Sequence, residues 1–166
     1  KTDTNGKYAI VFDVGSKQIV SYTKEGKAAS IDTELPIIKA IVSKSGVVTA
    51  LVEESRSTDI VFFDNEGKKL DIIVKSKLSG DGFPTDIAIS PDGTALLAAF
   101  QYLKGSSMMG RVVFYDFSEI GKNMPNRVVG GFDEEFVSSM VARVKYLDKI
   151  NSVAIASDGL YFFSSK

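Results

Sequence analysis

Acidic side chains are the residues of this chain best suited to catalysis, because its 166 residues include no His and no Cys. Without imidazole or thiol groups, Ser-His-Asp triads, zinc hydrolase sites and thiolate nucleophiles are excluded, and carboxylate pairs of the glycosidase type remain. Asp13, Asp64 and Asp116 recur at or near the ends of apolar stretches. Recurrence of this kind is typical of turn capping. We therefore predict no catalytic residue and favour a protein that is not an enzyme.

Further acidic residues lie in turn-like segments, where carboxylate oxygens would suit hard cations such as Ca²⁺. These residues are Glu53, Glu54, Asp81, Asp133, Glu134 and Glu135. Their spacing matches no complete Ca²⁺-binding loop, so we predict no metal site. The segment Gly80–Gly82 is not a phosphate-binding loop, because no helix is expected to follow it. We accordingly predict no cofactor.

Apolar side chains in three predicted connecting segments are the candidates for partner binding. The longest segment, Tyr102–Gly110, contains two adjacent Met residues, which can form an adaptable contact surface. The alternative is a mobile insertion whose Met side chains fold back onto the protein. The aromatic residues of the other segments either stack on a ligand or fill space between neighbouring sheets, and the second role is the commoner one. The candidate residues are Phe83, Tyr102, Met108, Met109, Phe132 and Phe136.

Short β-strands are the elements expected to position these residues. Stretches rich in Val, Ile, Phe and Tyr alternate with turns rich in Gly, Asp, Asn and Ser along nearly the whole sequence. The best candidate for a helix, 134–146, reads equally well as a strand preceded by a short helical turn at 133–135. The predicted fold class is therefore all-β.

An internal repeat organises the predicted strands. The segment Ile60–Asp64 (IVFFD) is matched by Val112–Asp116 (VVFYD), and less fully by Ile19–Thr23 and Leu160–Ser164. Further apolar stretches, separated by turns, lie before these copies at similar spacings. The resulting period is about 40 to 50 residues, which is the length of a four-stranded β-propeller blade.

The phase of the strands within this repeat predicts the blade boundaries. We expect one β-propeller-like domain over residues 1–166, with blade pieces at 1–34, 35–77, 84–133 and 137–166. The first piece lacks its first strand and the last lacks its fourth, which makes fourteen strands, or about three and a half four-stranded antiparallel blades. Because an open arc leaves blade faces uncovered, we expect a fragment of a larger propeller. Two chains sharing one ring, and a sandwich or small barrel, stay open as alternatives.

The turn Ser90-Pro91-Asp92-Gly93 resembles the SPDG turn of WD40-like and TolB-like bacterial propellers. The strand pattern of the whole chain is most similar to an uncharacterised propeller domain, of unknown function, in Gram-positive envelope proteins. The Trp-Asp pair that ends WD40 blades is absent, because the chain has no Trp. The resemblance implies an extracytoplasmic domain at the cell envelope, with a membrane anchor in the full-length protein. Since the chain starts at Lys1 without a Met, we expect upstream sequence.

Composition narrows the range of partners. The net charge is −1, with 20 basic and 21 acidic residues, and the scattered Lys residues argue against nucleic-acid binding. No apolar run reaches the roughly 18 residues of a membrane-spanning helix. We therefore expect a non-catalytic binding or scaffold module that recognises a protein, peptide or glycan through loops on one face, with self-association or missing blades completing the ring. The alternative is a propeller enzyme, glycosidase- or lactonase-like, with a carboxylate or metal site at the central channel.

Overall fold

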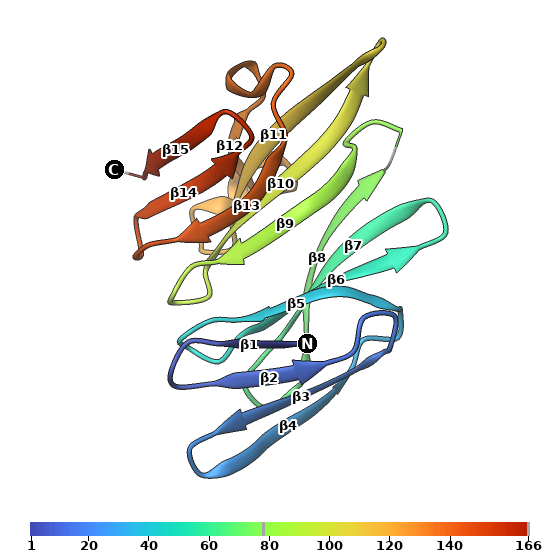
Figure 1. Cartoon of the computed structure of the whole chain (residues 1–166). Coiled ribbons are helices and arrows are strands. Elements are labelled where there is room, and N and C mark those ends of the chain that lie inside the picture. The colour runs from blue at the N-terminus through green and yellow to red at the C-terminus, as the bar shows by residue number, and fades with distance from the viewer. Residues whose placement is uncertain (78, 166) are drawn as a thin grey trace. The chain divides into compact units, whose positions relative to one another are not determined.

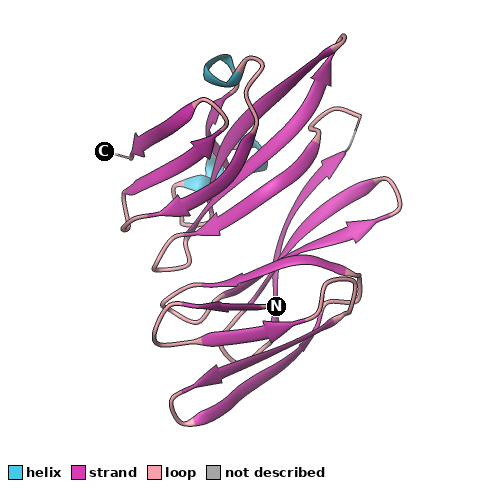
Figure 2. Ribbon diagram, in the orientation of Figure 1, coloured by secondary structure: helices cyan, strands magenta, loops and turns pink. Residues whose placement is uncertain are grey.

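The computed structural model describes residues 1–77 and 79–165 of the chain (Figure 1). Antiparallel β-strands dominate it, and short 3₁₀ helices occur in the C-terminal half (Figure 2). The chain divides into two compact units, Lys1–Ser76 and Lys77–Lys166. Each unit contains two antiparallel sheets, which confirms the all-β class. That the whole chain forms one domain stays a prediction.

The first sheet shows where the predicted strand count is wrong. Its strand order is β1-β2-β3-β4, formed by Thr2–Thr4, Ala9–Phe12, Gln18–Thr23 and Gly26–Asp32. The predicted pattern lacks β1, because Thr2-Asp3-Thr4 contains no apolar side chain. Backbone pairing with β2, from Thr2 opposite Val11 to Thr4 opposite Ala9, nevertheless makes it a strand. The first blade is therefore complete, and the described residues form fifteen strands instead of fourteen.

The second sheet is buried on both faces at its centre. It has the order β5-β6-β7-β8, formed by Ile37–Val42, Val48–Glu54, Ser57–Phe63 and Lys69–Lys77. Near-continuous apolar runs in β6 and β7 match this double burial. Side chains from both sheets form the core of the first unit, among them Ile10 and Ile19 from the first sheet and Ala50, Val61 and Phe63 from the second.

The third sheet begins the second unit and carries the candidate site. Its order is β12-β11-β10-β9, formed by Phe83–Ile89 (β9), Ala95–Lys104 (β10), Ser107–Asp116 (β11) and Val128–Phe132 (β12). Two 3₁₀ turns, η1 (Gly121–Asn123) and η2 (Pro125–Arg127), connect β11 to β12. The strands β10 and β11 are ten residues long, which is longer than the average strand.

The fourth sheet has three strands, in the order β13-β14-β15. It is preceded by η3 (Glu134–Phe136) and is formed by Val141–Tyr146, Asn151–Ala156 and Gly159–Ser164. The short helical turn followed by a strand at 133–146 agrees with the sequence prediction. The core of the second unit combines Leu97, Ala99 and Val112 of the third sheet with Phe136, Val144 and Ala154 from η3 and the fourth sheet.

An aspartate joins the first strands of neighbouring sheets in each unit. In the first unit, the Asp3 carboxylate accepts a 2.8 Å hydrogen bond from the backbone N–H of Val42. In the second unit, the carboxylate of Asp86, which is 2% exposed, accepts a 2.8 Å hydrogen bond from the N–H of Val144. A hydrogen bond to a charged acceptor is stronger than a neutral one, so these bonds supplement the apolar packing between the sheets.

The strand β15 forms one edge of the fourth sheet and has two unlike faces. Tyr161 and Phe163 pack against the core, whereas Leu160 and Phe162 are 59% and 69% exposed. The alternation follows from the two-residue period of a strand. Completion of the ring by further blades or by self-association stays a prediction. Among the described residues, no helix is both long enough and apolar enough to cross a membrane.

Candidate functional site

The hairpin formed by β10 and β11 replaces the loop predicted at Tyr102–Gly110. Pairing continues without interruption from Ala95 opposite Asp116 to Lys104 opposite Ser107. Only Gly105 and Ser106 remain as the turn, and Gly105 adopts a positive φ of 64°. The prediction of a loop is wrong: Lys, Gly and Ser at 104–107 interrupt the apolar pattern, but they do not interrupt the backbone pairing on either side of the turn. The candidate residues of this segment therefore lie on a paired strand scaffold.

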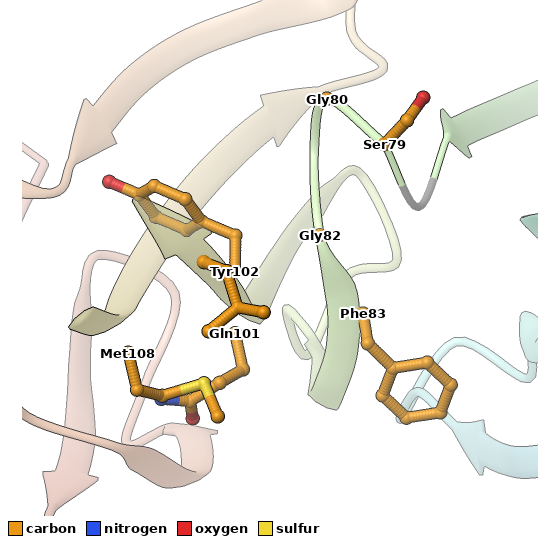
Figure 3. Close-up of a pocket in the computed structure, with 8 residues that line it drawn as sticks. Ser79, Gly80, Gly82, Phe83, Gln101, Tyr102 and Met108 are labelled. Carbon is orange, nitrogen blue, oxygen red and sulfur yellow. The ribbon is translucent and has the colours of Figure 1, made fainter. Parts of the chain in front are cut away.

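A hollow of about 550 Å³ lies beside the start of β9, the end of β10 and the start of β11 (Figure 3). Its lining residues are Ser79, Gly80, Gly82, Phe83, Gln101, Tyr102, Leu103 and Met108. The volume falls within the range of small-molecule pockets, which is roughly 300 to 1,000 Å³. All these residues belong to the second unit, so the hollow is formed by one compact body.

Gly82 allows the segment before β9 to approach β10 closely. It has a positive φ of 88°, and a Cβ at this position would lie 2.7 Å from the Tyr102 Cβ and still closer to the Gln101 carbonyl oxygen. A shift in register between Ala99 and Phe100 changes the pairing of β9 with β10 next to this contact. Irregularities of this kind are common beside functional sites, because they redirect side chains.

The strand register decides which side chains share a face. Gln101 pairs with Gly110 on β11 and with Phe83 on β9, and Leu103 pairs with Met108. Because residues two apart on a strand, and residues paired across two strands, point to the same side, Gln101, Leu103 and Met108 belong to one face. The Phe83 ring is directed away from Gln101 and Met108 (Figure 3). Tyr102 projects from the other face of β10 (Figure 3).

Arg111 holds the Tyr102 ring in place. Its guanidinium carbon lies 4.7 Å from the ring centroid, and its Nη2 lies 3.6 Å from Oδ2 of Asp133. A guanidinium over an aromatic face is attracted by the ring electrons, and the carboxylate orients the guanidinium in turn. Tyr102 is therefore a positioned wall of the hollow rather than a free side chain.

The hollow brings together three of the six residues predicted to bind a partner. Phe83, Tyr102 and Met108 line it, and Phe83 and Met108 are 46% and 52% exposed. Exposure leaves these apolar side chains accessible to a partner. Their role in binding stays a prediction.

Of the other three predicted residues, Phe136 and Met109 face the protein interior, and Phe132 is half-buried beside a smaller hollow of about 170 Å³. Phe136 is fully buried with its ring centroid 4.6 Å from that of Tyr161, and Met109 is 7% exposed. Phe132 packs among Phe114 and Phe163, at centroid distances of 5.9 and 4.9 Å. These contacts match the space-filling role that is usual for such residues.

Gln101 and Leu103 line the hollow and were not predicted from the sequence. Among residues 95–103, Gln101 is the only one outside the hydrophobic class. A polar residue inside an apolar strand was the one feature of the sequence that could have pointed to Gln101 as a site residue. Leu103 is 68% exposed at the end of β10. Its exposure was not predictable, because an isolated Leu in a strand is normally buried.

The acidic residues do not converge on the hollow. The Asp81 carboxylate turns back to accept a 2.9 Å hydrogen bond from the N–H of Lys77, and Asp133 pairs with Arg111. Over residues 1–77 and 79–165, no group of three or more His, Cys, Asp or Glu side chains could hold a metal ion. The polar character of the hollow comes instead from Ser79 and Gln101.

Antiparallel sheets built from consecutive strands are the blades of a β-propeller, and this chain is a β-propeller protein with four blades. The chain belongs to the Family of unknown function (DUF5711), whose model matches residues 1–166. No curated protein matches it.

The solved structures that are similar to this chain include the following two. One is the hydrazine synthase of Kuenenia stuttgartiensis, with a TM-score of 0.65 and 17% identity, covering 93% of this chain and 42% of that one. The other is the Dos1 propeller, with a TM-score of 0.45 and 12% identity, covering 95% of this chain and 52% of that one. The chain therefore spans about half the length of each or less. At 17% identity, the first likeness shows the fold alone.

Proposed function

We propose that this chain is a non-catalytic binding module that recognises a protein, peptide or glycan at the hollow on the third sheet. The observation that carries the proposal is the exposure of Phe83, Leu103 and Met108 around one concave site of about 550 Å³. Binding sites are typically concave, mostly apolar and supplied with a few polar groups. The flexible Met108 side chain can adapt to the shape of a partner.

The rigid surroundings of the hollow also support a binding role. Strand pairing fixes β9, β10 and β11, and Arg111 fixes the Tyr102 ring. A partner would therefore meet a strand backbone and a Tyr102 ring that are already in place, which lowers the entropy lost on binding. The enzyme alternative needs converging carboxylates or a metal, and no observation on the described residues favours it.

Peptide and glycan arrays test this proposal. The protein is expected to bind a subset of positions on one array, and Leu103→Lys and Met108→Lys should each weaken that binding at least tenfold, because a cation would be buried against apolar walls. The matched control is Ile120→Lys, since Ile120 is 75% exposed but does not line the hollow. Equal binding by all four proteins, or no binding on either array, would contradict the proposal.

The proposal includes a location outside the cytoplasm, at the cell envelope. Its support is the resemblance of the Ser90–Gly93 turn and of the strand pattern to envelope propellers. Fractionation of cells that produce the natural full-length protein tests it. Recovery with the envelope fraction, and digestion by protease added to cells whose wall has been removed, are expected. Recovery with the cytoplasmic fraction would contradict this location.

A further inference from the structure

The Gln101 side chain is a buried amide with no partner. Both its Oε1 and its Nε2 are buried, and neither forms a hydrogen bond with any of the residues that the structure describes. Native proteins satisfy nearly all buried polar groups, because an unpaired one loses its hydration without compensation. An amide with both ends unpaired, in the lining of a hollow, therefore indicates a site for a complementary group.

The position of Gln101 explains how a bound group could reach the amide. On β11, Gln101 has Gly110 as its neighbour, which is buried: a Cβ at Gly110 would lie 2.7 Å from the Ser139 carbonyl oxygen. That side is closed, so a bound group has to reach the amide from the side of Met108. Met108 lies diagonally across on the same face, at a separation that long side chains bridge. Because Met108 is half-exposed and unbranched, a change of its rotamer can uncover the amide. Figure 3 shows Gln101 and Met108 directed to the same side of the hollow.

The chemistry of the amide restricts what fits. A glutamine amide presents one acceptor and one donor side by side. In an extended peptide, the N–H and C=O of a single residue point in the same direction and offer the matching pair. The neighbouring walls, Leu103 and Met108, are apolar and suit an aliphatic side chain on the adjacent residue. A sugar ring has apolar C–H faces, but it also carries more hydroxyl groups than Ser79 and Gln101 can pair, so an apolar peptide segment suits these walls better.

We propose that Gln101 binds the main chain of an extended apolar peptide segment, through paired hydrogen bonds to the N–H and C=O of one residue. This inference rests on the proposed binding function and specifies its partner as a peptide. Met108 moves aside and packs on the peptide side chain, while Leu103 flanks it.

Nuclear magnetic resonance titration with a small peptide mimic tests the inference. The probe is acetyl-leucine-N-methylamide, and the side-chain ¹⁵N–¹H₂ signals of Gln101 are the readout. The matched control probe replaces the leucine N–H by an ester oxygen. On the native chain we expect the Gln101 signals to move with the amide probe and the ester to bind at least tenfold more weakly, because it leaves an acceptor unpaired.

The variant Gln101→Leu removes the amide at similar volume, and Gln101→Met serves as a second variant if the first does not fold. The backbone N–H signals of residues 101–103 report binding in these variants, and either variant should bind the amide and the ester equally weakly. Equal affinity of the native chain for both probes would overturn the role of Gln101, although array binding sensitive to Met108→Lys would leave the proposed function standing. Signals that move with the sugar maltose but not with the amide probe would overturn the peptide assignment. If the Gln101 signals do not move with any of these probes, the amide holds only water, and the inference is overturned as well.

Discussion

Asp86 and Val144 are joined by a buried 2.8 Å hydrogen bond from the Val144 N–H to the Asp86 carboxylate, across two sheets of the second unit. The bond ties the first strand of the third sheet to the first strand of the fourth. Asp3 and Val42 are joined in the same way in the first unit. The packing of neighbouring blades in each unit therefore includes a directional contact as well as apolar burial.

Removal of the Asp86 carboxylate should destabilise the second unit. We expect Asp86→Ala to lower the free energy of unfolding by about 1.5 to 3 kcal/mol, because the Val144 N–H would remain buried without its acceptor. Asp86→Asn, which keeps an acceptor oxygen, should cost less. Urea unfolding followed by circular dichroism measures both. The control is Glu134→Ala, an exposed carboxylate of the same unit, which should change the free energy by less than about 0.5 kcal/mol.

Gly82 and Gly80 provide a matched pair of substitutions next to the hollow. Gly82→Ala should destabilise the chain by more than about 1 kcal/mol, because its φ is 88° and the new Cβ would meet the backbone of β10. Gly80→Ala should be nearly neutral, since no atom lies within 4 Å of a Cβ there and its φ is not positive. Thermal unfolding compares the two variants. A similar loss of stability in both variants would show that Gly82 does not approach β10 as closely as described.

Two of the residues predicted to bind a partner, Phe136 and Met108, lie in the core and at the surface, and their substitution should affect stability differently. Phe136→Ala should lower the free energy of unfolding by about 3 to 5 kcal/mol, because it removes a fully buried ring from the contact with Tyr161. Met108→Ala should change it by less than about 0.5 kcal/mol, since Met108 is half-exposed. Chemical unfolding of each variant decides the assignment. A tolerated Phe136→Ala would contradict its place in the core.

Asp92 in the SPDG turn should make stability depend on pH in the acid range. Burial raises the pKa of its carboxyl, but hydrogen bonds from Ser90, Thr94 and Lys149 outweigh burial and lower it from 3.8 to about 2. A folded-state pKa below the unfolded value means that the stabilisation is fully present above about pH 4 and is lost as the pH falls towards about 2. The difference in unfolding free energy between the native chain and Asp92→Ala should therefore shrink over that interval.

Unfolding of both proteins at several pH values between 2 and 7 measures this difference. It should be constant at the neutral end of the range and smallest at the acid end. A difference that does not change with pH would show that the hydrogen bonds of Asp92 do not favour its charged form. The Ser90 hydroxyl, which donates to Asp92 at 2.7 Å, is the second position to test, and Ser90→Ala should reduce the pH dependence in the same direction.

The sequence determined the fold class, the repeat and the turn chemistry, because these depend on local patterns. The two-residue period of apolar side chains indicates strands, and the recurrence of IVFFD as VVFYD sets the phase of the blades. The strand Thr2–Thr4 was not predicted from the sequence, because backbone pairing and an aspartate hold it in place and it carries no apolar pattern.

The candidate site was decided by tertiary structure. Adjacent Met108 and Met109 look equivalent in the sequence, but the strand register sends Met108 to the hollow and Met109 to the interior. Gln101 stood out only as a polar residue in an apolar run, and its lack of a hydrogen-bond partner exists only once β9, β10 and β11 are packed. Which side of a strand is buried, and what covers a polar atom, depend on residues distant in the chain, and no local pattern contains that information.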